Sequence, residues 1–62
     1  MKVREVIKLI EEDGWYFVRQ RGSHRQFKHP QKTGLVTVAG KMSIEMPVGT
    51  LKGILRQAQL ED

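Results

Sequence analysis

The sequence contains no cysteine, no long hydrophobic run and no acidic residue between positions 14 and 44. The lack of cysteine excludes a disulfide framework and a thiolate metal site, and it suits a reducing compartment. No apolar segment approaches the ~18 residues that a membrane span requires, and the first residues enter an amphipathic pattern directly. We therefore expect a cytoplasmic protein that does not act on a membrane.

The short chain also lacks the material for a deep pocket. A chain of 62 residues is expected to form a single domain, 1–62, and a domain of this size buries only ~60% of the surface that it exposes when unfolded. One thin hydrophobic layer cannot wall off a dinucleotide, a flavin or a haem. We expect no small-molecule cofactor.

Positive charge is concentrated in the stretch that has no acids. The net charge is +4, and the cations of this stretch are Arg19, Arg21, Arg25, Lys28, Lys32 and Lys41. All seven acids lie outside it, at Glu5, Glu11, Glu12, Asp13, Glu45, Glu61 and Asp62. Clustered lysines and arginines displace counterions from phosphates, which favours a polyanionic partner. The alternative is a solvated face that keeps the protein soluble.

Hydrophobic periodicity predicts a helix at each end of the chain. Val3, Val6, Ile7 and Ile10 have helical spacing, which indicates a helix over about 2–13, and Gly14 is placed to end it. A second apolar stripe predicts a helix over about 47–60, with Pro47 near its start and Thr50 as a possible N-cap.

Three short strands are predicted between these helices. Segments 15–20, 24–29 and 35–39 are separated by turn residues at 21–23 and 30–34, which indicates an antiparallel meander. Both helices can cover one face of such a sheet. The expected fold is α+β, two layers in the order α-β-β-β-α with a three-stranded antiparallel sheet.

The alternation of side chains along a strand assigns residues to the two faces of the sheet. If Phe27 faces the helices, Arg25 and His29 point with it, whereas His24, Gln26 and Lys28 point to the open side. In the first strand, Trp15 and Phe17 share one face, and Tyr16 and Val18 share the other. Since both faces are apolar, we expect one to be uncovered, as a base-stacking platform, a partner site or a self-association surface.

The two histidines do not form a metal site in this arrangement. His24 and His29 differ by five positions and therefore project to opposite faces of a strand, and the stretch around them supplies no carboxylate. Ser23 lacks the Gly-x-Ser-x-Gly elbow of a hydrolase, and we interpret it as a turn residue.

His24 is then the candidate for chemistry. An imidazole exchanges a proton near neutral pH, and RNA carries its own nucleophile in the 2′-hydroxyl. One positioned base and cations that stabilise the phosphorane can cleave such a strand. The alternative interpretation is an ordinary surface histidine.

The segments GWYFVRQRGSHRQFKHP (14–30) and GTLKGILRQA (49–58) resemble the HicA family of toxins. The resemblance implies a fold like that of double-stranded-RNA-binding domains, cleavage of mRNA independent of translation, and a HicB-type antitoxin that covers the active site. The essential histidine of the family falls on His24, and Gly22 shapes the approach to it.

Two positions depart from the family pattern. Many members carry a proline and a second histidine after the third strand, where this chain has Ala39-Gly40-Lys41. Lys41 can replace only the charge of that histidine. The usual glycine near the end of the chain is Gln59 here, which is expected to affect the helix stop rather than the chemistry.

These observations support three hypotheses. In the first, the protein is a metal-independent endoribonuclease in which His24 is catalytic. The residues expected to hold RNA are Arg21, Gly22, Ser23, Arg25, Lys28 and Lys41. In the second, it is a non-catalytic module for double-stranded RNA, although Lys52 stands alone where such domains carry a lysine cluster. In the third, the open sheet face binds a small acidic protein partner, which is compatible with the first.

Overall fold

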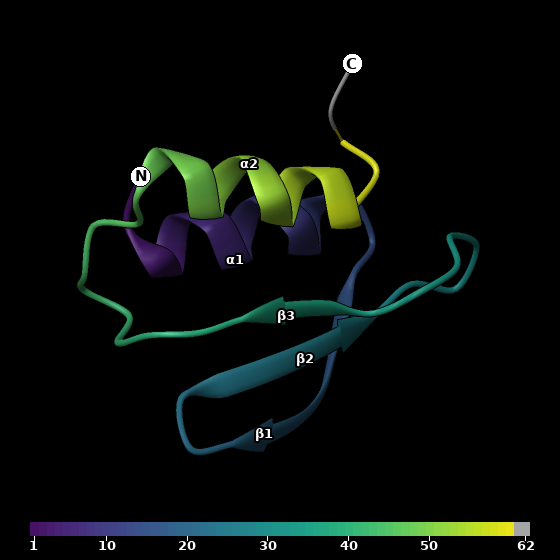
Figure 1. Cartoon of the computed structure of the whole chain (residues 1–62). Helices are drawn as coiled ribbons and strands as arrows, with labels where there is room; N and C mark the ends of the chain where they lie inside the picture. Colours follow the sequence, from purple (N-terminus) through teal and green to yellow (C-terminus); the bar gives the residue numbers. More distant parts are fainter. Residues whose placement is uncertain (61–62) are drawn as a thin grey trace.

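Two helices cover one face of a three-stranded antiparallel sheet in the computed structural model, which describes residues 1–60 (Figure 1). The elements are α1 (Val3–Glu12), β1 (Tyr16–Arg21), β2 (His24–Lys28), β3 (Val36–Val38) and α2 (Val48–Gln57). The α-β-β-β-α layout expected from the sequence is confirmed. Within residues 1–60, neither helix is long and apolar enough to cross a membrane. Glu61 and Asp62, two of the acids counted above, lie outside the described residues.

The core lies between the helices and the two strands nearest to them. The apolar stripe of α1 is buried as its spacing predicts, and Phe27 on β2 is 2% exposed. Trp15 lies just before β1 rather than in it, and its indole Nε1 donates to the carbonyl of Ala58, 3.3 Å away. The buried residues are Val3, Val6, Ile7, Ile10, Trp15, Phe27, Val36, Val38, Met46, Ile54 and Ala58. Within this core, Trp15 joins the end of α1 to the end of α2.

The second helix begins two residues before the predicted cap. Pro47 occupies the N-cap position and its carbonyl accepts from the N–H of Leu51 at 2.9 Å, so the prediction of Thr50 as N-cap is wrong. Proline suits this boundary because its φ is fixed and the helix needs no N–H donor there. At the other end Gln59 has φ 58°. This is the left-handed conformation that glycine adopts most easily.

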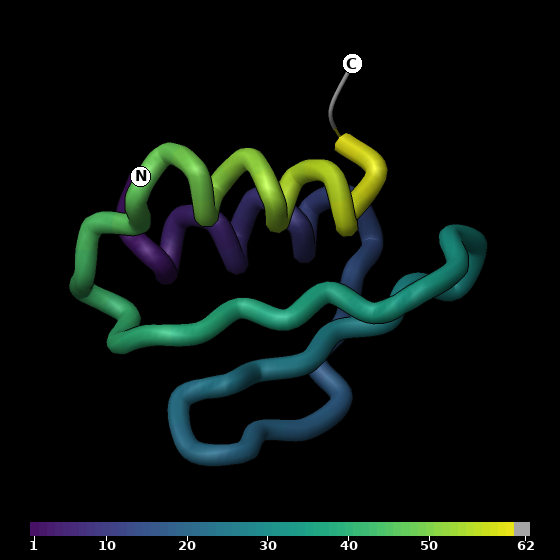
Figure 2. The backbone as a smooth tube through the Cα atoms, in the orientation of Figure 1, coloured from purple at the N-terminus to yellow at the C-terminus, as the bar shows by residue number. Residues whose placement is uncertain are grey.

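Both helices start at the end of the molecule that carries the β1–β2 turn. The backbone trace shows α1 and α2 running side by side in the same direction, with the 39–46 connection at their starts (Figure 2). That connection is fastened to α1, because the N–H groups of Val3 and Arg4 donate to the carbonyls of Ile44 and Met42. The hairpin turn and the 39–46 connection therefore share one end of the fold.

Strand β1 is exposed along its whole length. It forms one edge of the sheet, in the order β1-β2-β3, and lies farthest from the helices (Figure 1). The sequence indicated one uncovered face, but Phe17 and Tyr16, which point to opposite faces, are both about half exposed, at 50% and 52%. Two short helices suffice to cover only β2 and β3, so β1 extends beyond the core.

A β-bulge in β1 changes which of its residues reach the open face. Phe17 pairs with Phe27 and Arg19 pairs with Gln26, so Val18 has no partner in β2. Because a bulge adds one residue to the strand, the side chains after it point to the opposite face from the one that regular alternation would give. Arg19 consequently lies on the open face with Gln26, whereas strict alternation would have placed it with Phe17.

Gly14 provides the sharp turn between α1 and β1, with φ +113°. A Cβ at this position would lie 2.6 Å from Nε2 of His29. We expect Gly14→Ala to lower the free energy of unfolding by about 3 kcal/mol, because a strained backbone and a steric clash add. Chemical denaturation measures this loss.

The matched control is Gly53→Ala inside α2, where a Cβ meets nothing within 4 Å. Alanine is the better helix former by about 1 kcal/mol, so this variant should be slightly stabilised. Equal stability of the two variants would contradict the role given to Gly14.

Candidate functional site

A two-residue turn places His24 at the start of β2. Arg21 pairs with His24 across the turn, and Gly22 has φ +56° while Ser23 does not have a positive φ. This sign pattern is that of a type II′ turn, in which glycine occupies the first central position. Gln20 supports the turn, because its Nε2 donates to the carbonyl of Gly22 at 2.7 Å. The imidazole therefore stands on a well-defined hairpin.

The open face of the sheet carries His24 among cations. Cross-strand partners project to the same face, so Arg21 lies directly beside His24. Further along, Nε of Arg19 donates to Oε1 of Gln26 at 2.6 Å. Lys28 is on the same face, four residues from His24, which corresponds to about 13 Å along the strand. His24 and Lys28 therefore stand at opposite ends of β2 on the same face.

Arg25 points away from this face and fastens the hairpin to the chain after β3. It pairs with Val38, and its Nη1 donates to the carbonyl of Gly40 at 2.8 Å and, more weakly, to that of Ser23 at 3.4 Å. Gly40 precedes the exposed Lys41 in the chain. Arg25 thus supports the turn through its hydrogen bonds to the carbonyls of Ser23 and Gly40. Because Gly40 precedes Lys41, Lys41 lies at the same end of the molecule as His24.

The predicted site residues therefore form two groups and one outlier. Arg21, Gly22, Ser23 and His24 make up the turn and its flanks. Arg25 donates to the carbonyl of Gly40, the residue before Lys41, and Lys28 lies at the far end of β2. Arg19 belongs to the open face although sequence reasoning did not select it. No sequence signal marks the bulge at Val18 that turns Arg19 to this side.

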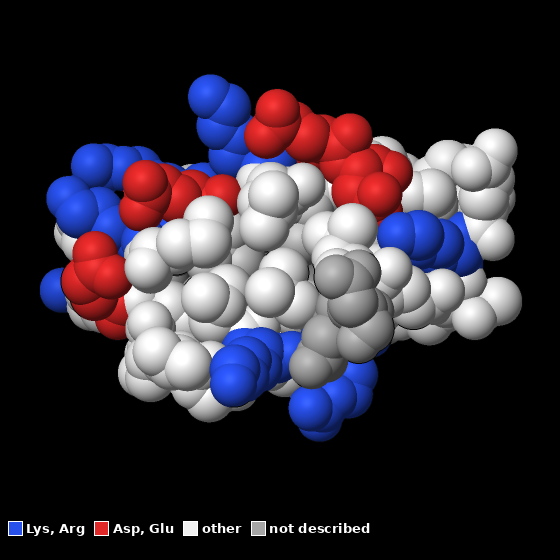
Figure 3. All heavy atoms as spheres, turned by 90° about the horizontal axis from the view of Figure 1, so that it is seen from above, with Lys and Arg blue, Asp and Glu red and all other residues white. Residues whose placement is uncertain are grey.

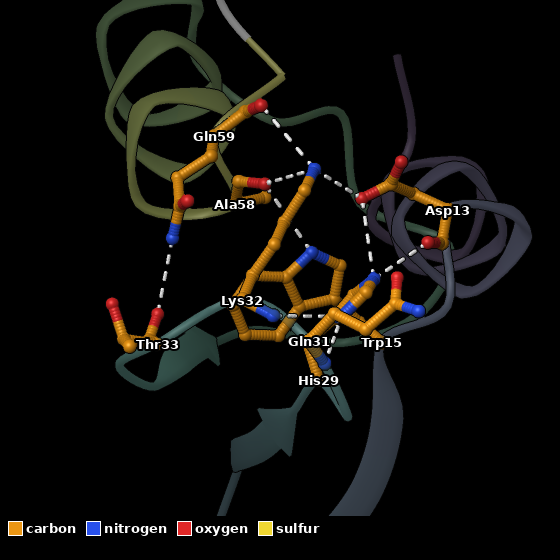
Figure 4. Close-up of polar contacts among 8 residues, drawn as sticks. All are labelled: Asp13, Trp15, His29, Gln31, Lys32, Thr33, Ala58 and Gln59. Carbon is orange, nitrogen blue, oxygen red and sulfur yellow. Dashed lines mark hydrogen bonds and ion pairs between the residues drawn. The ribbon is translucent and has the colours of Figure 1, made fainter.

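The two histidines have opposite environments. Only 6% of the His29 side chain is exposed, and main-chain groups engage both ring nitrogens. Its Nε2 donates to the carbonyl of Asp13 at 2.7 Å, and its Nδ1 accepts from the N–H groups of Gln31 and Lys32 at 3.0 and 3.1 Å (Figure 4). In this arrangement the hydrogen must be on Nε2.

His24, by contrast, is exposed, and no hydrogen bond to its ring occurs within residues 1–60. A proton acceptor must have a free lone pair on an accessible nitrogen. His24 meets this condition, whereas His29 serves the fold.

A charged cluster beside His29 holds together the ends of both helices. The ammonium of Lys32 lies 2.6 Å from Oδ2 of Asp13 and also donates to the carbonyls of Ala58 and Gln59 (Figure 4). A cation is favourable at the negative end of a helix dipole. The hydrogen bond from Lys32 is the largest cause that lowers the pKa of Asp13 below its ordinary value.

Acidic side chains are absent from the described strands. Every acid among residues 1–60 lies in α1, at its C-cap or in the 39–46 connection. Figure 3 shows acidic groups interspersed with basic ones on the helix side of the molecule. The open face around His24 therefore has no negative charge of its own.

The described residues enclose no pocket and contain no group of three side chains suited to a metal ion. A flat, cationic face without a cavity is suited to an extended anion rather than to a small molecule. The fold and site thus define a small basic α+β domain whose open sheet face carries cations and, among the described residues, no acids.

The family is shown by comparison with known proteins. The model of the family described as the HicA toxin of bacterial toxin–antitoxin systems matches residues 3–60. The chain therefore belongs to the HicA toxin family and is the toxin of a toxin–antitoxin system, with an antitoxin as partner. No curated protein matches the chain.

The lowered pKa of Asp13 leads to a prediction for acid stability. Because the folded state holds the Asp13 proton less tightly than the unfolded chain, the stabilisation is present above the unfolded pKa of about 4 and is lost as the pH falls below it. We expect Asp13→Asn to show a smaller loss of stability between about pH 5 and pH 3 than the parent. Denaturant unfolding at several pH values measures the difference.

Glu12→Gln is the control, since it removes a neighbouring carboxylate that has no contact with Lys32 within the described part of the chain. If both variants followed the parental pH dependence, Asp13 would not be coupled to folding in this way.

Proposed function

We propose that this toxin binds mRNA on the open face of its sheet and cleaves it with His24, as an endoribonuclease. The observation that carries the proposal is the position of the imidazole. It is exposed on the hairpin that Gln20 and Arg25 support, beside its cross-strand partner Arg21 and on a face without acids. Cleavage of RNA by its own 2′-hydroxyl requires a general base that removes the hydroxyl proton and a positive charge that stabilises the phosphorane.

The reaction begins with transfer of a proton from the 2′-hydroxyl to His24. The 2′-oxygen attacks the adjacent phosphorus, the bond from phosphorus to the 5′-oxygen breaks, and the departing 5′-oxygen takes a proton from a solvent water molecule, which has access to this exposed site. The products are a 2′,3′-cyclic phosphate and a 5′-hydroxyl. Arg21 is the cation placed to stabilise the charge of the phosphorane, because it is the direct cross-strand neighbour of His24.

The remaining cations hold the strand at a distance from the reacting bond. Lys28, about 13 Å away along β2, and Lys41, on the 39–46 connection, bind other phosphates. Gly22 and Ser23 let the backbone of the turn approach the RNA. Arg25 contributes to RNA binding mainly by holding the turn and Lys41 in place, since its guanidinium donates a hydrogen bond to the Gly40 carbonyl.

This chemistry requires neither a metal ion nor a cofactor, because the nucleophile comes from the substrate and the base from the protein. We propose that the toxin acts in the cytoplasm, where mRNA is available. A HicB-type antitoxin restrains it by covering His24.

The central prediction concerns His24→Ala. Removal of a general base costs about 10²–10⁴-fold in rate, so the purified variant should cleave RNA at least about a hundredfold more slowly and should still bind it. Cleavage of a labelled mRNA fragment in EDTA, followed on denaturing gels, measures the rate, and gel shifts measure binding.

Lys8→Ala, which removes an exposed side chain from α1, is the control and should cleave within about threefold of the parent, because Lys8 has no role in proton transfer or in holding the RNA. If His24→Ala cut RNA at the parental rate, the proposal would be wrong. If the parent itself shifted duplex RNA and left it intact, a non-catalytic binding module would be the correct interpretation.

Salt dependence tests the assignment of Lys28. Each phosphate contact to a single strand contributes about 0.7 to the slope of log K against log salt. We expect Lys28→Ala to reduce this slope by about 0.7. Lys8→Ala, an exposed cation on α1, is expected to leave it unchanged. Equal slopes for the two variants would remove Lys28 from the interface.

A further inference from the structure

The two edges of the sheet differ in how far they are protected. β3 contributes only three residues, and its Thr37 N–H is met by Oε1 of Gln57 from α2 at 3.4 Å. β1 contributes six residues, and within residues 1–60 no segment pairs with its outer side. An exposed strand edge is a template for another strand. β1 is therefore the free edge of this fold.

The core is also incomplete at this edge. Phe17 and Phe27 are cross-strand partners in an edge-to-face contact, with ring centroids 6.0 Å apart. Phe27 is 2% exposed but Phe17 is 50% exposed. The row of apolar side chains that packs under the helices thus ends at Phe17, whose ring is covered on only one side. A side chain from one more strand would cover the remaining half of the ring.

The backbone of Gln20 presents the hydrogen-bonding groups of the edge. Arg21 and His24 flank a two-residue turn, and such a pair exchanges both of its backbone hydrogen bonds. Because hydrogen-bonded and non-hydrogen-bonded pairs alternate in an antiparallel ladder, the N–H and C=O of Gln20 point outward. They are available to a strand from another chain.

We propose that the antitoxin docks by adding an extended, acidic segment to the outer edge of β1. The partner is a polypeptide because the edge offers alternating amide groups in strand geometry and a half-buried aromatic ring. It is acidic because Arg19 and Arg21 lie on β1 and residues 14–44 contain no acid. For the same reason two copies of β1 would repel one another if they paired.

Strand addition at this edge also explains inhibition. β1 ends at Arg21, the direct neighbour of His24, so an added strand brings the partner to the side of the proposed catalytic residue. This consequence rests on the proposed function of His24. The docking mode does not, because it can be tested by binding alone.

Two substitutions at Gln20 separate the backbone from the side chain. Gln20→Pro removes the outward N–H, and proline is tolerated on edge strands where that group faces solvent. Gln20→Thr also loses the side-chain bond to Gly22 but keeps the N–H. We expect Gln20→Pro to weaken binding of the antitoxin encoded with this chain by at least about tenfold, and Gln20→Thr to stay within about threefold of the parent. Calorimetry measures both, after circular dichroism has confirmed that the variants are folded.

Amide hydrogen exchange of the labelled toxin, free and in complex, provides a readout that does not depend on a variant. Protection gained at Gln20 supports strand addition at β1. Protection gained at Thr37 or only on the helices, or equal binding by Gln20→Pro and Gln20→Thr, would overturn it. So would a dimer of the free toxin that Gln20→Pro dissociates, because the edge would then belong to a second copy. Loss of RNA cleavage in His24→Ala is measured separately, so either proposal can fail without the other.

Discussion

Burial of Phe27 is the constraint on which the rest of the molecule depends. The ring is almost fully enclosed, and a strand cannot shift by one residue without turning every side chain to the other face. With Phe27 fixed inside, His24 and Lys28 must face outward, and Arg25 and His29 must face the helices. One apolar residue thereby separates the proposed catalytic histidine from the structural one.

The sequence was sufficient to predict the order of the elements and the two faces of β2, because that strand is regular and has one dominant apolar residue. It was insufficient for β1, where a bulge at Val18 interrupts the alternation and no residue type announces it. The site was predicted in part for the same reason. The turn around His24 was predicted from local chemistry, whereas the position of Arg19 follows from the irregular strand. The engagement of Arg25 with Gly40 depends on a contact across 15 residues.

The two ends of the fold have different tasks. At one end, side chains from the loop after β2 join the ends of both helices through hydrogen bonds to main-chain oxygens. At the other end, main-chain hydrogen bonds tie the 39–46 connection to the start of α1, and Arg25 ties the hairpin to Gly40. The side chain of His24 takes part in neither set of contacts and is exposed, so its position is held by the backbone of the turn.

Gln59, just after α2, connects that end of the chain to the loop that follows β2. Its backbone adopts a conformation that glycine would accept more readily, but its side-chain Nε2 donates to the carbonyl of Thr33 at 3.0 Å, and its own carbonyl accepts from Lys32. Together with the bond from Lys32 to the carbonyl of Ala58, three hydrogen bonds therefore join the 30–34 loop to the residues that follow α2. Opening of this surface loop requires these bonds to break, so it is coupled to the end of α2. Access of a protease to residues 30–34 is expected to depend on the packing of that helix against the core.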